Sequence, residues 1–239
     1  GEGPPVLLLH GWGAEIALVW PLAQRLIPLG YRVYAPDLPG FGETAEPPQP
    51  WSVYDYAQFV VTYMDYHSLG RAHMFGHSFG GRLGLILGAE HPDRLISMAL
   101  ADAAGLRKPP PLTARARLRL YKGVRDGLKA AGLGSLSDRL RGWYNHRYGS
   151  SDFNATTGIM RETFVQVVNE DLRDHARRVA VPVLLIWGDA DADTPLWQAQ
   201  ELERLIPDAG LMTYPGAGHY SYLEHPVQTA RAMHALFKG

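Results

Sequence analysis

Short apolar segments alternate with helical segments along this chain, and the alternation restricts its fold more than any other feature. Runs rich in aliphatic residues occur at 6–10, 32–37, 72–77, 95–102, 181–188 and 211–215. Helical patterns lie near 15–29, 54–68, 79–90, 195–206 and 226–237. Strands that alternate with helices build a parallel sheet covered on both sides. The sequence therefore predicts an α/β fold, with a mostly parallel central sheet and helices on both of its faces.

One long segment interrupts this alternation. Residues 106–178 carry helical patterns without a convincing strand, and they hold 15 Lys and Arg against 7 Asp and Glu. The rest of the chain holds 8 basic against 17 acidic residues. We therefore expect an α/β core formed by 1–105 and 179–239, with a helical cap inserted at 106–178. Its basic residues, such as Arg115 and Lys122, are expected on a solvated helix face, with substrate steering as the second interpretation and no nucleic-acid partner.

Composition narrows the class of protein further. With 46% hydrophobic and 20% charged residues in 239, the chain resembles an ordinary globular protein. It contains no run that approaches the roughly 18 apolar residues of a membrane span, and its first apolar run is too short for a signal peptide. We expect a soluble, cytoplasmic protein without a membrane span. The absence of cysteine excludes disulfides, thiol nucleophiles and Cys-ligated metals.

The motif Gly76-His77-Ser78-Phe79-Gly80 stands where an expected strand meets an expected helix. A Gly-x-Ser-x-Gly motif in this context is typical of a nucleophile elbow. Side chains at either glycine would collide with the neighbouring strand and helix, and the sharp turn would present the serine at the carboxyl edge of the sheet. The sequence predicts Ser78 as a nucleophile. It also predicts the backbone N–H of Phe79, at a helix N-terminus, as an oxyanion donor.

A serine hydroxyl needs a base and a group that orients the base. His219 is the strongest candidate of the ten histidines, because a glycine-rich loop after the last strand brings it to the same edge of the sheet. Asp189, Asp191 and Asp193 follow the fifth strand and would reach that edge too. Asp102 follows another strand and is the rival for the acid. The order Ser, Asp, His along the chain matches one known arrangement of such triads.

The loop after the first strand reads HGWGAE, and the backbone N–H of Trp12 is expected to be the second oxyanion donor. GFGETA at 40–45 resembles a nucleotide fingerprint, but Pro47 soon follows where that motif needs a helix, so we expect no nucleotide cofactor. His73 and His77 share a strand without a third ligand, and no metal is expected. The histidines interpreted as surface residues are His67, His91, His146, His175, His225 and His234.

The segments HGWG, DLPGFG, GHSFGG, GDADADTP and GAGH…EHP together resemble the capped α/β-hydrolases, over almost the whole chain outside 106–178. In that family the acid usually stands three residues after the glycine that ends its strand and four before a proline. The resemblance thereby selects Asp191, between Gly188 and Pro195. The other roles that it implies are Ser78 as nucleophile, His219 as base, and the backbone N–H groups of Trp12 and Phe79 as oxyanion donors, without a cofactor.

Within this family, a serine nucleophile argues against the haloalkane dehalogenase and epoxide hydrolase branches. The resemblance favours a carboxylesterase that forms an acyl-enzyme on small-molecule substrates, with short to medium apolar acyl esters as the preferred class. Carbon–carbon hydrolases of the meta-cleavage type tend to have Trp after the base, where this chain has Tyr220. Prolyl aminopeptidases and non-catalytic ligand-binding members are the remaining alternatives.

The expected cap also contains apolar side chains suited to a substrate pocket. About half of the following six are expected to pack internally and the rest to form an acyl or aryl site: Trp143, Tyr144, Tyr148, Phe153, Met160 and Phe164.

Overall fold

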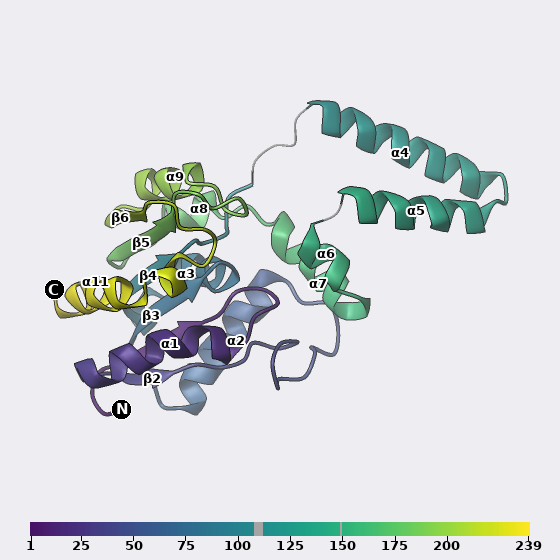
Figure 1. Cartoon of the computed structure of the whole chain (residues 1–239). Helices are drawn as coiled ribbons and strands as arrows, with labels where there is room; N and C mark the ends of the chain where they lie inside the picture. The colour runs from purple at the N-terminus through teal and green to yellow at the C-terminus, as the bar shows by residue number, and fades with distance from the viewer. Residues whose placement is uncertain (108–111, 149) are drawn as a thin grey trace.

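A computed structural model describes residues 1–107, 112–148 and 150–239 (Figure 1). Residues 108–111 and 149, which belong to the expected cap, lie outside the described residues. Six parallel strands form one sheet in the order β2-β1-β3-β4-β5-β6. The strands are β1 (Pro5–Leu9), β2 (Arg32–Tyr34), β3 (Ala72–His77), β4 (Leu95–Ala101), β5 (Val183–Gly188) and β6 (Ala209–Tyr214). The predicted α/β fold with a parallel sheet is confirmed, and all six expected strands are present.

Helices cover both faces of the sheet. One face carries α1 (Ile16–Leu26), α10 (Ser221–Glu224) and α11 (Pro226–Lys238), and the other carries α2 (Val53–Tyr66), α3 (Phe79–Glu90), α8 (Arg173–Ala176) and α9 (Trp197–Leu205). Two 3₁₀ turns, Ile27–Leu29 and Pro92–Arg94, complete the core. Alternate residues of β1 enter opposite apolar clusters: Leu7 packs on the α3 side and Leu8 on the α1 side. This explains why β1 reads as a continuous apolar run.

Four further helices lie between β4 and α8: α4 (Leu112–Ala130), α5 (Gly134–Tyr148), α6 (Ser151–Ala155) and α7 (Gly158–Asn169). Helices α4 and α5 pack against each other and extend away from the sheet (Figure 1). Helix α7 instead lies against the core, where the hydroxyl of Thr163 accepts a 3.0 Å hydrogen bond from the Trp51 N–H. No helix in the described part of the chain has the length and apolar character needed to cross a bilayer.

Candidate active site

Ser78 occupies a sharp turn between β3 and α3. Its backbone adopts φ 50° and ψ −104°, a left-handed region that L residues other than glycine seldom enter. A Cβ atom at Gly76 would lie 2.4 Å from the carbonyl oxygen of Gly80, and one at Gly80 would lie 2.3 Å from that of Leu9. The collisions expected for side chains at the two glycines are therefore present, and only glycine fits at both positions.

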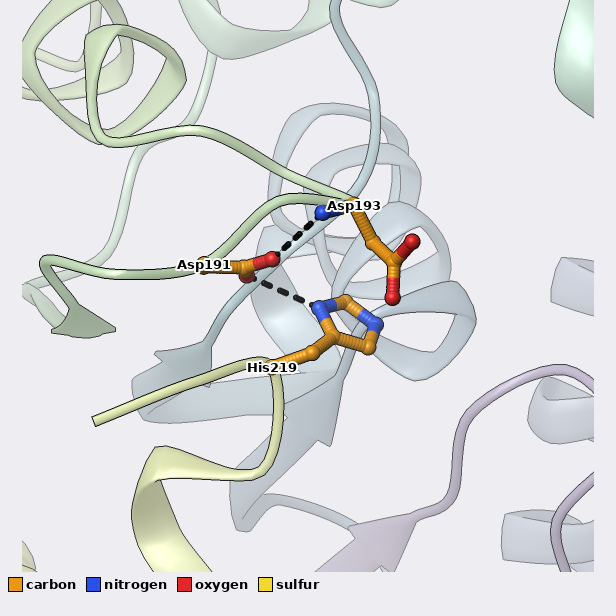
Figure 2. Close-up of side chains that lie close together, drawn as sticks. All are labelled: Asp191, Asp193 and His219. Atoms are coloured by element: carbon orange, nitrogen blue, oxygen red, sulfur yellow. Dashed lines mark hydrogen bonds and ion pairs between the residues drawn. The ribbon is translucent and has the colours of Figure 1, made fainter.

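The structure brings Ser78, His219 and Asp191 into one chain of hydrogen bonds. His219 Nε2 lies 3.0 Å from Ser78 Oγ, and His219 Nδ1 lies 2.8 Å from Asp191 Oδ2. The other carboxylate oxygen, Asp191 Oδ1, accepts from the backbone N–H of Asp193 at 2.7 Å (Figure 2). It also accepts from the backbone N–H of Thr194 at 2.9 Å. This geometry suits a serine whose proton is removed by a histidine that a carboxylate orients.

Asp191 and His219 influence each other's pKa. Burial disfavours the charged imidazolium of His219, but the hydrogen bond and the charge of Asp191 outweigh burial and raise the pKa of His219 above 6.5. Burial would raise the pKa of Asp191, whereas hydrogen bonds from His219 and Thr194 lower it overall. Asp191 is therefore ionised at neutral pH, and His219 accepts a proton more readily than a free imidazole.

Asp102 lies beside this chain of hydrogen bonds, but its side chain bonds Gly188 and Ser221 and not the ring of His219. It is fully buried, and its carboxylate accepts from the N–H of Gly188 at 2.9 Å and from the N–H and hydroxyl of Ser221 at 3.1 and 2.6 Å. Burial raises the pKa of Asp102 to about 7. The hydrogen bonds of Asp102 thus join the end of β5 to the segment that follows His219. Asp189 instead accepts from the N–H of Gly216 at 2.6 Å.

Residues that support the candidate triad were not all predicted. The hydroxyl of Thr194 donates to Asp191 Oδ2 at 2.6 Å, and Ser221 anchors the chain two residues after His219. In the sequence, the only indication of a supporting role for Thr194 and Ser221 was that they stand close to Asp191 and His219. The contact of Thr194 with Asp191 depends on the turn after β5, which local sequence patterns do not specify.

Asp191, Asp193 and His219 also form the group best arranged for a cation among the described residues, with one donor atom of each within 4.8 Å of the others (Figure 2). However, Asp191 Oδ2 and His219 Nδ1 already share a hydrogen bond. A cation between them would have to replace that bond, so the geometry favours proton transfer over metal binding at this position.

The structure also describes two histidines, His73 and His175, that were predicted from the sequence to lie outside the candidate triad. His73 Nδ1 lies 2.9 Å from the hydroxyl of Ser97, whereas His77 Nε2 lies 2.7 Å from the backbone carbonyl of His219, so these two buried rings have separate partners. His175 was interpreted as a surface residue, and this interpretation is wrong. It is buried, and its Nε2 atom lies 2.9 Å from Glu90 Oε1.

The two predicted oxyanion donors both lie at the cavity that contains Ser78. Phe79 is the first residue of α3, where helix N–H groups have no partner within the helix. The N–H of Gly80 donates to the carbonyl of His10 at 3.1 Å and joins the elbow to the loop after β1. Trp12 belongs to that loop, and both Trp12 and Phe79 line the cavity into which Ser78 opens.

This cavity has a volume of about 530 Å³ and an apolar wall formed by Trp12, Phe79, Phe164, Val167 and Val168. The ring of Trp12 lies 5.4 Å from that of Phe79 and 5.1 Å from that of Phe164 in edge-on arrangements. Of the six apolar side chains proposed for the pocket from sequence, Phe164 alone lines it. The expectation that several of them do so is therefore wrong. Trp143, Tyr144 and Tyr148 belong to α5, which extends away from the sheet, and Met160 is buried in the apolar core.

The charged lining of the cavity consists of Arg82, Asp152 and Asp193. Burial lowers the pKa of Arg82 to about 10, and its guanidinium donates to the carbonyl of Glu170 at 2.8 Å. Burial and the nearby charge of Asp193 raise the pKa of Asp152. The basic side chains of α4 do not line the cavity, so the charge that faces a bound molecule is not the excess of basic residues seen in the sequence.

Comparison with known proteins places the chain in a family. Residues 4–226 match the model of the alpha/beta hydrolase fold, and the chain therefore belongs to this family. The resemblance stated from the sequence motifs is confirmed.

Two relatives and one solved structure illustrate the range of similar proteins. A dihydrolipoyllysine-residue acetyltransferase component of the acetoin cleaving system from Pseudomonas putida is 27% identical over 251 residues; the match covers 100% of this chain but 65% of that relative. A pimeloyl-[acyl-carrier protein] methyl ester esterase from Chromobacterium violaceum is 28% identical, with 98% of this chain and 94% of the relative covered. A meta-cleavage product hydrolase from Pseudomonas fluorescens superposes with a TM-score of 0.73 at 23% identity, covering 100% of this chain and 92% of that one, which shows a shared fold.

Proposed function

We propose that this protein is a serine hydrolase that cleaves carboxylic esters through an acyl-enzyme. Ser78 is the nucleophile, His219 the general base and Asp191 the acid that orients it. The observation that carries the proposal is the continuous pair of hydrogen bonds, 3.0 Å and 2.8 Å long, that joins these three side chains at the strained turn after β3. The esterase relative from Chromobacterium violaceum supports an ester as the substrate class.

Acylation follows from this geometry. Ser78 Oγ attacks the ester carbonyl carbon while His219 Nε2 takes the hydroxyl proton, and Asp191 stabilises the imidazolium that forms. The carbonyl oxygen becomes an oxyanion, which accepts hydrogen bonds from the N–H groups of Trp12 and Phe79. The tetrahedral intermediate then expels the alcohol, which leaves with the proton from His219. Water repeats the sequence on the acyl-enzyme, releases the carboxylic acid and restores Ser78.

The same proposal extends to the substrate and to residues 106–178. We assign the part of this segment that precedes α8 to a cap, because α7 contributes Phe164, Val167 and Val168 to the wall of the cavity, whereas α8 packs on the sheet. The cavity combines polar groups near Ser78 with an apolar wall of Trp12, Phe79, Phe164, Val167 and Val168, and this wall favours short to medium apolar acyl chains. The acidic groups Asp152 and Asp193 disfavour a substrate that carries a carboxylate near the ester.

A substrate screen tests the proposed reaction. The panel contains p-nitrophenyl esters from acetate to laurate, monomethyl pimelate, a meta-cleavage dienoate and a prolyl arylamide. We expect kcat/KM to peak at an acyl length between acetate and octanoate and to exceed the values for the dienoate and the arylamide by about 100-fold, since the tetrahedral intermediate expels the alcohol of an ester more readily than an amine or a carbon leaving group.

Ser78→Ala serves as the control for contaminating hydrolases. A dienoate or an arylamide turned over faster than every ester would replace the proposed reaction with one of the alternative chemistries. No turnover of any substrate, with Ser78 unreactive, would favour a non-catalytic ligand-binding protein.

A further inference from the structure

His77 lies between the two segments that flank the candidate nucleophile. It is the last residue of β3, directly before Ser78, and its ring is almost completely buried. The ring lies 4.9 Å from that of His219 and 4.8 Å from that of Tyr220. On its other side, a Cβ atom at Gly11 would lie 2.8 Å from His77 Nδ1. The ring therefore fills the space between the loop after β1 and the loop that carries the base.

One hydrogen bond connects this ring to the base. His77 Nε2 lies 2.7 Å from the backbone carbonyl oxygen of His219. A carbonyl only accepts, so Nε2 carries the proton and donates it, while Nδ1 is the unprotonated nitrogen. Nδ1 is buried and has no hydrogen-bond partner among the described residues. Burial and the neighbouring His219 lower the pKa of His77 to about 3, so the donor persists wherever His219 titrates.

The loop that carries His219 contains Gly216, at φ 75°, and Gly218, both of which give the backbone more freedom than other residues do. The carboxylates of Asp189 and Glu224 accept from the N–H groups of these two glycines, and His77 adds a hydrogen bond at His219 itself. His77 and Ser78 are consecutive, and the N–H of Ser78 is held by the carbonyl of Ala101 at 3.0 Å. The nucleophile and the donor to the base loop are thus parts of one rigid turn.

We propose that His77 is a positioning residue, which holds His219 at hydrogen-bonding distance from Ser78 by donating to the backbone carbonyl of His219. The inference rests on the proposed role of His219 as the base. His77 also lines the cavity at Ser78, but in the proposed role it acts through the loop that carries His219 and transfers no proton. Its contribution is to fix the starting point of the His219 side chain, and displacements near 1 Å from a reactive geometry lower rates by as much as about 100-fold.

Three variants test this role, with p-nitrophenyl butyrate as substrate. His77→Phe keeps a ring but removes the donor, and we expect kcat to fall about 10- to 100-fold while KM changes less than about 3-fold. His77→Gln can place an amide N–H near the position of Nε2 and should retain at least about a third of wild-type kcat. His73→Phe, on the same strand, removes a buried histidine that bonds Ser97 instead, and kcat should stay within about 3-fold.

Two further measurements complete the test. The rate constant for reaction of Ser78 with a fluorophosphonate should follow kcat across the variants, because it reports activation of the nucleophile alone. Melting temperatures identify any variant that fails to fold. If His77→Phe does not fold, His77→Asn replaces it, since its amide reaches the Nδ1 side of the ring and not Nε2.

The inference is wrong if His77→Phe retains more than half of wild-type kcat, if His77→Gln loses as much as His77→Phe, or if His73→Phe causes an equal loss. Failure of the proposed function has a different signature, which is activity that survives Ser78→Ala. An inactive Ser78→Ala together with a fully active His77→Phe would overturn the role of His77 alone.

Discussion

Asp191, Asp193 and Asp102 lie close together after neighbouring strands, yet their hydrogen bonds give them different tasks. Asp191 bonds the side chain of His219, whereas Asp102 bonds the backbone at Gly188 and the hydroxyl and backbone of Ser221. Asp193 has its backbone N–H bonded to Asp191, and its side chain is exposed. In the sequence, only the spacing from Gly188 and to Pro195 distinguishes Asp191 from the other carboxylates. In the structure, each of the three has its own hydrogen-bond partners.

Substitution of each aspartate by asparagine tests this division. Asp191→Asn removes the charge that stabilises the imidazolium, and kcat should fall by about 10³- to 10⁴-fold. Asp193→Asn should lower kcat less than about 10-fold, because its carboxylate only contributes to the field at His219. Steady-state kinetics with p-nitrophenyl butyrate measure both. A larger loss for Asp193→Asn than for Asp191→Asn would reverse the assignment.

The pKa of His219 leads to a prediction about pH. Because the base must be neutral to accept a proton, kcat/KM should rise with pH and reach half its maximum above pH 6.5. Asp191 raises this pKa by stabilising the charged imidazolium, so its replacement by asparagine should shift the midpoint downward. The measurement is the pH profile of kcat/KM for both proteins. An unchanged or higher midpoint in Asp191→Asn would show that Asp191 does not act on the titrating group.

At the scale of elements, the turn between β3 and α3 depends on two close approaches of the backbone. Gly76→Ala would bring a Cβ atom within 2.4 Å of the Gly80 carbonyl oxygen, which is backbone and cannot rotate away. We expect this variant to lower the melting temperature by several degrees and to remove reactivity of Ser78 toward a fluorophosphonate. Gly123→Ala in α4 is the matched control, because a Cβ atom there meets nothing within 4 Å.

Gly123→Ala should leave both quantities unchanged or raise the melting temperature slightly, since alanine favours a helix over glycine. Full reactivity of Ser78 in Gly76→Ala would show that the elbow tolerates a side chain at position 76 and that the close approach to Gly80 is not required.

The elements were predictable from the sequence to different degrees. The expected strand at 72–77 coincides with β3. A strand that is buried on both faces consists mainly of apolar residues, so the sequence itself reveals it. The approach of Ser78 to His219 was also predictable, since the carboxyl ends of parallel strands meet at one edge. The packing of Phe164 on Trp12 and the extension of α4 and α5 were not, because they depend on contacts between distant segments that no local pattern encodes.

At the scale of the whole molecule, most of the basic residues of the insert lie on helices that do not line the cavity at Ser78. Helices α4 and α5 extend away from the sheet with most of the basic residues of the insert (Figure 1), while the cavity is lined by Asp152, Asp193 and the partnered Arg82. Charges in water act over roughly 10 Å at 0.1 M salt, so the nearby carboxylates dominate the approach of an anion to Ser78.

A matched pair of esters tests this separation. A neutral butyrate ester should have a kcat/KM about 10-fold higher than a monoester of a dicarboxylic acid at low ionic strength, and salt should narrow the difference by screening the repulsion. Rates are measured at low and high ionic strength with both substrates. A preference for the anionic ester that disappears at high salt would instead indicate steering by the basic helices.

The most direct measurement is mass spectrometry of the protein after reaction with a fluorophosphonate, combined with turnover of p-nitrophenyl butyrate. The proposed triad predicts one adduct, located on the peptide that contains Ser78, and loss of turnover in step with labelling. Ser78→Ala should form no adduct and should lose at least about 10⁴-fold in turnover. An adduct on another residue, or a Ser78→Ala protein that keeps more than a tenth of wild-type turnover, would contradict the assignment of Ser78 as the nucleophile.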